Sequence, residues 1–318
     1  MALVRPLLLA VALVMSAAPA FAADKLTVVL DWFVNPDHGP LVIARERGFF
    51  AAEGLDVELI APADPNDPPK LVAAGKADLA VSYQPQLHLQ VQEDLPLVRV
   101  GTLVATPLNS LVVLADGPIK SIADLKGRKI GFSVGGFEEA LLGAMLEKHG
   151  LTLADVELVN VNFSLSPALI SGQVDAVIGA FRNFELNQME LVGHPGRAFY
   201  PEEEGVPAYD ELILLANRDG LARPELRHFL TAVENATAWT INHPDEAWDV
   251  FKATDPALDD ELNRRAWLAT LPRLAHRPAA LDHGRYQRFA AFLAARGLIG
   301  PPPAVATYAV DLFEEPGS

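Results

Sequence analysis

The segment from Gly131 to Gly135 has the Gly-x-Ser-x-Gly pattern that exposes a nucleophilic serine between a strand and a helix. A serine hydrolase would also need an acid and a histidine, and Asp175 with His276 or His283 follows Ser133 in a suitable order. No His-Gly-Gly-type segment for an oxyanion hole precedes the serine. A glycine loop at a helix N-terminus is explained equally by ligand contact, and we predict no catalytic residue.

Other reactive chemistry is restricted by composition. The 318 residues include no cysteine, which excludes disulfides, thiolate metal sites and cysteine nucleophiles. The eight histidines form no His-Glu-x-x-His motif, and no phosphate-binding glycine loop of the Walker or dinucleotide type is present. We therefore predict no metal site and no cofactor. With 41 acidic and 25 basic residues, the net charge of −16 disfavours a nucleic-acid partner.

Aromatic and amide side chains follow several predicted strands, where ligands of open α/β sheets bind. Trp32, Tyr83 and Phe181 could enclose a flat ring by stacking. Hydrogen-bonding groups beside them could recognise ring nitrogens and an exocyclic amine. We predict a small heteroaromatic ligand, held by Trp32, Asn35, His38, Tyr83, Ser133, Gly135, Phe181, Asn183 and Glu185.

Several of these residues, and some of their neighbours, also have a purely structural interpretation. Trp32 could be a core aromatic at a strand end, and His38 a loop residue or the partner of a helix cap. Glu185 would ordinarily be a surface acid, and Arg182 could form an ion pair instead of touching a ligand. The pair Glu138-Glu139 has the position of first-turn helix charges.

A duplicated unit positions these residues. Strands at 26–30, 56–60 and 78–81 alternate with helices at 41–47 and 70–74, and the same order recurs about a hundred residues later. The second unit has strands at 129–133, 155–159 and 175–178 and a helix at 137–149. The pattern predicts two similar α/β lobes, each a mainly parallel sheet flanked by helices, with the ligand cleft between them.

Two further strands, at 110–114 and 211–216, are predicted to be the crossings between lobes. Beyond Pro224 the pattern is helical, at 226–242, 246–253, 259–271 and 283–296. We predict that this tail packs on the first lobe. The first lobe would then comprise residues 23–112 and 215–318, and the second residues 113–214.

The first 22 residues have the pattern of a secretory signal peptide. Arg5 is their only charge, an apolar run extends from Leu7 to Met15, and Ala20-Phe21-Ala22 is a small-x-small cleavage site. Without a cysteine for a lipid, we expect a secreted, periplasmic protein with no direct membrane anchor.

The segment Asp31-Trp32-Phe33-Val34-Asn35-Pro36-Asp37-His38, the two Gly-x-x-Asp segments at 75–78 and 172–175, and the run from Phe181 to Glu185 resemble the NMT1/THI5-like family. The resemblance covers residues 25–220. It implies a two-lobed periplasmic binding protein of type II-like fold, monomeric, which delivers its ligand to the membrane permease of an ABC importer.

Within that family the sequence is most similar to ThiY-type proteins, which bind pyrimidine precursors of thiamine such as formylaminopyrimidine or hydroxymethylpyrimidine. The resemblance assigns ring contacts to Trp32, Asn35, Tyr83 and Glu185. Arg182 stands where a second aromatic would be expected, which leaves riboflavin, or an anion of the nitrate, sulfonate or taurine type, as alternatives. The family also includes fungal pyrimidine synthases, but their cysteine-rich segment is absent here and Ser82 stands where their lysine would be.

Overall fold

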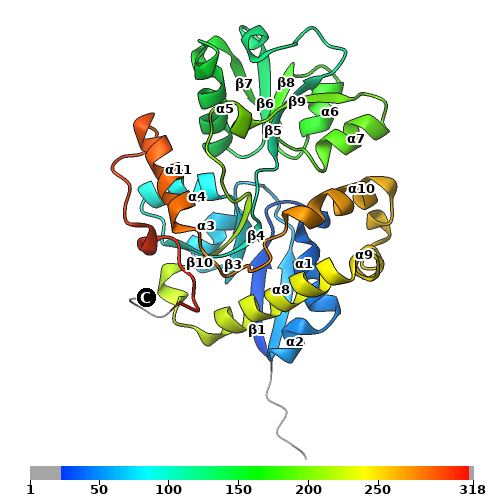
Figure 1. Cartoon of the computed structure of the whole chain (residues 1–318), viewed down its shortest axis with the longest axis vertical. Coiled ribbons are helices and arrows are strands. Elements are labelled where there is room, and N and C mark those ends of the chain that lie inside the picture. Colours follow the sequence, from blue (N-terminus) through cyan, green and yellow to red (C-terminus); the bar gives the residue numbers. More distant parts are fainter. Residues whose placement is uncertain (1–22, 315–318) are drawn as a thin grey trace, which may run out of the picture.

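The computed structural model describes residues 23–314, which form two lobes joined at a narrow waist (Figure 1). The predicted signal peptide lies outside the described residues. Each lobe is built on one five-stranded sheet. The first sheet has the order β2-β1-β3-β10-β4 and the second the order β7-β6-β8-β5-β9.

The strands of the first sheet are β1 (Asp24–Val29), β2 (Leu55–Ile60), β3 (Leu79–Ser82), β4 (Leu97–Val104) and β10 (Leu212–Asn217). Those of the second are β5 (Asn109–Leu114), β6 (Lys129–Phe132), β7 (Glu157–Asn160), β8 (Ala176–Phe181) and β9 (Gly196–Phe199). In the first sheet β1, β2 and β3 pair in parallel, and β10 is antiparallel to its neighbours β3 and β4. In the second sheet β6, β7 and β8 pair in parallel, and β5 is antiparallel to its neighbours β8 and β9. The mainly parallel sheets and the internal duplication are confirmed.

The repeated Gly-x-x-Asp segments have equivalent structural roles. Asp78 Oδ2 accepts a hydrogen bond from Thr27 N at 2.8 Å, and Asp175 Oδ2 accepts one from Lys129 N at 2.9 Å. Each aspartate thus ties the start of the third strand of its unit to the first strand. Gly75 and Gly172 have φ angles of 67° and 74°, a left-handed conformation that glycine adopts without strain and that ends the preceding helix.

Both crossings between lobes lie before the predicted boundaries. Residues 105–108 join β4 to β5, and residues 200–211 lead from β9 back to β10. Because β5 pairs in the second sheet and β10 in the first, the predicted boundaries at 112 and 214 fall inside strands. All of β5 therefore belongs to the second lobe and all of β10 to the first, because each strand pairs in the sheet of that lobe. The edge strands β4 and β9 were not predicted from the sequence.

Helices cover both faces of each sheet (Figure 1). The first unit contributes α1 (Gly39–Glu46), α2 (Phe49–Ala52), α3 (Pro68–Ala73) and α4 (Gln84–Gln92), and the second contributes α5 (Phe137–Lys148), α6 (Leu165–Ile170) and α7 (Glu185–Leu191). The tail forms α8 (Pro224–Asn242), α9 (Pro244–Lys252), α10 (Glu261–Thr270) and α11 (His283–Ala295). Helices α8 and α9 pack on α1, and α11 packs on α4, so the tail packs on helices of the first lobe.

One buried cation fastens the tail to the first sheet. Arg99, in β4, is fully buried and donates to the carbonyl oxygens of Pro278 and Ala279 at 3.1 and 2.8 Å. It also donates to Thr102 Oγ1 at 2.7 Å. The tail can therefore support α10, which extends from the first lobe toward α7 of the second.

Candidate ligand-binding site

A small cavity lies between the two lobes. The first lobe contributes Asp31, Trp32, Asn35, Asp37 and Tyr83 to its lining. The second lobe contributes Ser133, Val134, Glu138, Leu165, Gly179, Phe181, Phe184 and Glu185. The lobes are closed on one another around this space.

The loop after β1 is held by a buried hydrogen-bond network. His38 is fully buried, and its Nδ1 accepts from Asn35 N at 3.3 Å while its Nε2 lies 2.8 Å from Asp31 Oδ1. The other oxygen of Asp31 accepts from the hydroxyl of Tyr83 at 2.8 Å. His38 does not line the cavity, so its role in this structure is to orient Asp31, which does.

Asn35 shapes the same loop. Its Oδ1 accepts from Asp37 N at 2.8 Å and caps the short helical turn Pro36–His38, while its Nδ2 donates to Phe33 O at 3.2 Å. One amide hydrogen of Asn35 remains for the cavity.

Asn183 connects the lobes instead of lining the cavity. Its Nδ2 donates to Asp37 Oδ1 at 2.6 Å and lies 2.8 Å from Thr270 Oγ1, at the end of α10. Burial raises the pKa of Asp37 to about 6, although the bonds from Thr270 and Asn183 oppose that change. The second lobe therefore reaches both the β1 loop and the tail through one amide.

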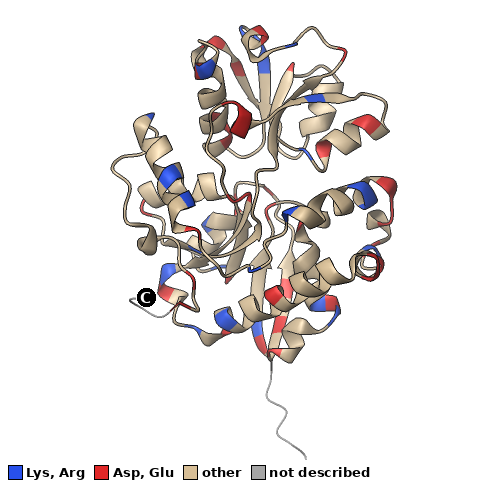
Figure 2. Cartoon of the chain, in the orientation of Figure 1, with Lys and Arg blue, Asp and Glu red and all other residues tan. Residues whose placement is uncertain are grey.

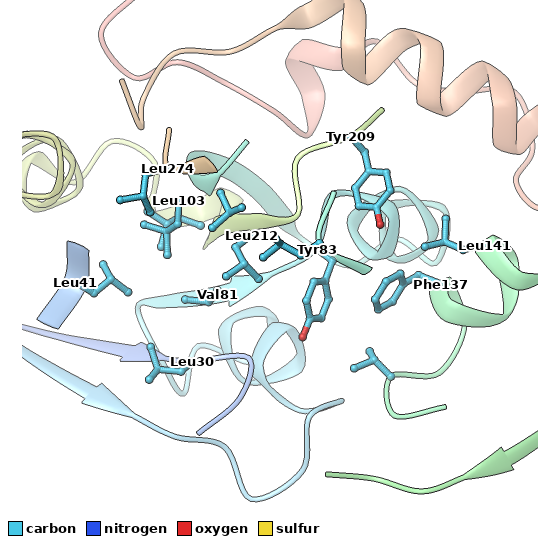
Figure 3. Packing of buried hydrophobic residues seen from close by; sticks show 14 of the residues in the cluster. Leu30, Leu41, Val81, Tyr83, Leu103, Phe137, Leu141, Tyr209, Leu212 and Leu274 are labelled. Carbon is cyan, nitrogen blue, oxygen red and sulfur yellow. The ribbon is translucent and has the colours of Figure 1, made fainter. Parts of the chain in front are cut away.

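Aromatic rings close the cavity from both lobes. Tyr83 of the first lobe and Phe137 of the second lie side by side (Figure 3), and their stacked rings have centroids 4.7 Å apart. Trp32 meets the edge of Phe163 at 4.5 Å, and Phe181 meets Tyr83 edge-on at 6.4 Å. A flat, apolar ring face has suitable partners on both sides of this space.

Glu185 lies at the start of α7, and its side chain is directed into the cavity. Its Oε2 accepts from Phe181 N at 2.7 Å. Burial raises the pKa of Glu185 to about 8, and the nearby carboxylate of Asp37 acts in the same direction. The interpretation of Glu185 as a surface acid is wrong, since the residue is buried, with 8% of its surface exposed.

Glu138 lies in the first turn of α5, the position that the sequence indicates, but it also lines the cavity, which was not predicted. It is 3% exposed, and its Oε2 accepts from Ser133 N at 2.8 Å. Its neighbour Glu139 bonds Gly136 N, outside the cavity. The sequence places both glutamates in the first turn of the helix after Ser133. Which of the two faces the cavity depends on the contacts between the lobes, so the sequence does not distinguish Glu138 from Glu139.

Ser133 is buried, and it does not make the hydrogen bond to a histidine that a hydrolase triad requires. Its hydroxyl donates to Asn162 O, and within residues 23–314 no histidine is bonded to it. Asp175 is engaged with Lys129 N, and His283 lies 3.7 Å from Glu314.

Gly135 forms a contact between the lobes. Its N–H donates to Asn66 Oδ1 at 2.9 Å, and Asn66 Nδ2 donates to Ser133 O at 3.2 Å. Asn66 lies in the loop between β2 and α3 of the first lobe, so this amide bridges the cleft.

Arg182 lies at the waist and not in the cavity. Its guanidinium donates to Asn109 O at 3.0 Å, pairs with Glu202, and lies 4.0 Å from the Tyr200 ring centre. Glu211 holds the same crossing by accepting from Leu108 N and Asn109 N at 2.5 and 2.9 Å. The expected ion pair of Arg182 therefore joins the two crossings.

The cavity is acidic on both sides. Four carboxyl groups line it, those of Asp31, Asp37, Glu138 and Glu185, and within residues 23–314 no lysine, arginine or histidine does. In the described part of the chain no three His, Asp or Glu side chains are arranged to hold a metal ion. The arrangement is suited to a ligand that presents hydrogen-bond donors or positive charge.

Six of the nine predicted site residues line the cavity: Trp32, Asn35, Tyr83, Ser133, Phe181 and Glu185. The other three, His38, Gly135 and Asn183, support the cavity from behind or connect its walls. Four further lining residues were not among the predicted site residues: Asp31, Asp37, Glu138 and Phe184. Asp31 and Asp37 lie in the motif already singled out, whereas Phe184 had no distinguishing sequence signal.

Two sheet-based lobes with a closed cavity between them define the periplasmic-binding-protein fold. The chain superimposes on the alkanesulfonate-binding protein SsuA of Xanthomonas axonopodis with a TM-score of 0.71, over 91% of this chain and 99% of that one, at 19% identity. No helix among residues 23–314 has both the length and the apolar character needed to cross a membrane.

The chain belongs to the NMT1/THI5-like family, whose model matches residues 35–247. It is 56% identical over 295 residues to a Haemophilus influenzae protein named as a thiamine biosynthesis protein, covering 92% of this chain and 94% of that one. It is 38% identical over 232 residues to the formylaminopyrimidine-binding protein of Halalkalibacterium halodurans, covering 72% and 70%. A more distant relative, 28% identical over 260 residues (77% and 75%), is the 4-amino-5-hydroxymethyl-2-methylpyrimidine phosphate synthase of Aspergillus parasiticus.

Proposed function

We propose that this protein binds a pyrimidine precursor of thiamine, formylaminopyrimidine or hydroxymethylpyrimidine, and delivers it to the permease of an ABC importer. The signal-peptide pattern of residues 1–22 supports action in the periplasm. The relationship to a formylaminopyrimidine-binding protein supports the ligand class.

The observation that carries this proposal is a closed cavity with aromatic walls and four carboxyl groups. The rings of Trp32 and Tyr83 lie on the first-lobe side, and Glu185 lies on the second-lobe side. An aminopyrimidine has a flat face for stacking and an exocyclic amine that donates to a carboxylate. A ligand that meets both walls stabilises the closed arrangement, which a permease can distinguish from the open one.

Anions and flavins suit this cavity less well. Nitrate, sulfonates and taurine would place a negative group among carboxylates without a lining cation, which is unfavourable in a desolvated site. The cavity is small, and it is suited to one substituted ring more than to the three fused rings and sugar chain of riboflavin.

An enzymatic role has less support. Ser82, which takes the place of the lysine of the fungal synthases, is buried in the first lobe, donates to Gln86 Oε1 at 2.8 Å and does not line the cavity. The hydroxyl of Ser133 is engaged with Asn162 O. We infer binding without turnover.

Calorimetric titration of the mature protein with formylaminopyrimidine, hydroxymethylpyrimidine, riboflavin and taurine tests the proposal. We expect saturable binding of at least one pyrimidine and none of taurine. Mass spectrometry of small molecules that copurify with the protein provides an independent identification. Tight binding of taurine or riboflavin without any response to either pyrimidine would overturn the assignment, and esterase activity lost in Ser133→Ala would overturn the non-enzymatic role.

A further inference from the structure

Glu138 lines the cavity, but the proposed ligand contacts do not include it. It extends from the second residue of α5, is almost fully buried, and lines the cavity on the second-lobe side. No lysine, arginine or histidine within residues 23–314 pairs with its carboxyl group. A carboxyl group in such a place requires either a neutralising partner or its own proton.

The backbone around Glu138 is adapted to this carboxyl group. Oε2 accepts from Ser133 N at 2.8 Å, which fixes the side chain above the glycine loop. Gly179 in β8 has a φ angle of 98°, and a Cβ atom there would lie 2.6 Å from Glu138 Cδ. Only a glycine leaves room for the carboxyl group at that point of the strand.

Two carboxyl groups of the second lobe therefore face one enclosed space. When like charges share a site without a cation, ionising one group disfavours ionising the other. Burial raises the pKa of Glu138 well above its ordinary range, and the acids Glu139 and Glu211 add to that effect. Glu185 ionises more readily than Glu138, because burial raises the pKa of Glu185 only to about 8.

We propose that Glu138 contacts the ligand directly as a hydrogen-bond donor, while Glu185 accepts from the ligand's amino group. A protonated carboxyl group presents one O–H donor and one acceptor oxygen. The ligand must then carry an acceptor, a ring nitrogen or a carbonyl oxygen, in addition to its amino group. This inference rests on the proposed function and adds a second specificity-determining residue to it.

The test uses substitutions that separate donation from charge. Glu138→Gln retains a donor and an acceptor, so formylaminopyrimidine should bind within about twofold of wild type. Glu138→Ala removes both, and affinity should fall about tenfold. Glu185→Gln cannot release a proton to become an anionic acceptor for the ligand's amino group, and it should weaken binding by a similar factor. Glu139→Gln is the matched control, an identical change one residue away and outside the cavity, and should leave affinity unchanged.

A second measurement distinguishes ligand contact from a purely structural bond to the Ser133 backbone. The infrared difference spectrum between ligand-bound and free protein should contain a shift in the carbonyl band of an un-ionised carboxylic acid. That shift should be present in wild type and Glu139→Gln and be reduced in Glu138→Gln. This readout remains available if Glu138→Ala fails to fold.

The outcomes are separable. The inference is overturned if Glu138→Gln weakens binding as strongly as Glu185→Gln, if a folded Glu138→Ala binds as tightly as wild type, or if the infrared shift is the same in Glu138→Gln as in wild type. Failure of wild type to bind either pyrimidine would instead overturn the proposed function, and this inference with it.

Discussion

The carboxyl side chains of this cavity are placed where their charge is costly. Asp31 is hydrogen-bonded by both His38 and Tyr83, and Asp37 by Asn183 and Thr270. Glu138 and Glu185 have only backbone N–H donors. The first-lobe acids thus support the structure, whereas the second-lobe acids keep bonding capacity for a ligand.

At this scale we predict that Trp32 and Glu185 act on one ligand from opposite lobes. Glu185→Gln should weaken binding about tenfold, because the amide cannot release a proton to become a charged acceptor for the ligand's amino group, and a hydrogen bond to a charged group contributes roughly 1.5 to 3 kcal/mol. Trp32→Ala should cost at least as much, since it removes stacking and buried area. The double variant should lose less than the product of the two factors, because both contacts depend on the closed state. Calorimetry with the bound pyrimidine measures all three, and wild-type affinity in Glu185→Gln would contradict the cross-lobe arrangement.

The same glutamate should make stability depend on pH. Below about pH 4.5 its carboxyl is protonated in folded and unfolded chains alike, whereas between that pH and about 8 only the folded protein keeps the proton. The folded state then binds more protons, so the free energy of unfolding should fall as pH rises through this window, by at most about 1.4 kcal/mol per pH unit for this group. Asp37 and Glu211, with pKa values raised to about 6 and about 7, act in the same direction over narrower ranges.

Denaturant unfolding of the ligand-free protein between pH 5 and pH 8 measures this slope. Glu185→Gln should make it shallower, and Glu139→Gln should not. Equal slopes in wild type and Glu185→Gln would show that Glu185 is not held in its neutral form.

At the scale of elements, the loop between β2 and α3 matters because it reaches the opposite lobe. Asn66 makes two hydrogen bonds to the glycine loop before α5, at 2.9 and 3.2 Å. Neither bond can persist when the lobes separate, so Asn66 stabilises only the closed state.

We therefore predict that Asn66→Ala releases ligand about tenfold faster, with little change in the stability of the free protein. Stopped-flow measurement of the dissociation rate checks this. Asn217→Ala is a matched control, because Asn217 donates to Val72 O and Ala73 O within the first lobe, at 3.1 and 3.2 Å. The control should lower stability without accelerating ligand release. Equal release rates in the two variants would contradict the role of Asn66 in stabilising the closed state.

For the whole molecule, closure is maintained by contacts at the cavity and at its rim. Arg265 in α10 lies 3.6 Å from Glu190 in α7, and Arg296 lies 3.2 Å from Glu147 in α5. These rim pairs are partly exposed and contribute little individually. Acidic residues are spread over both lobes (Figure 2), so overall charge does not draw the lobes together.

We expect the ligand to supply the remaining stabilisation of the closed form. The radius of gyration from small-angle X-ray scattering should be larger for the free protein and decrease when the pyrimidine is added. Asn66→Ala should need more ligand for the same contraction. A radius that does not change at saturating ligand would contradict hinge closure.

The sequence by itself determined the architecture of each lobe. The alternation of strands and helices and the helical tail follow from local hydrophobic periodicity, and the internal repeat provides a second, independent copy of the pattern. Trp32, Tyr83 and Glu185 could be placed at the carboxyl ends of strands because parallel strands direct those ends to one edge.

Only the tertiary structure decided which of these side chains meet. Glu138 and Glu139 are equivalent in a helical pattern, but they project in different directions from α5, and closure of the lobes removes water from one of them. Asn66 and Gly135 likewise lie in separate loops with no shared periodicity. Their pairing, and the assignment of Arg182 to the waist instead of the cavity, depend on how two lobes fit together, and local hydrogen-bond preferences do not encode that fit.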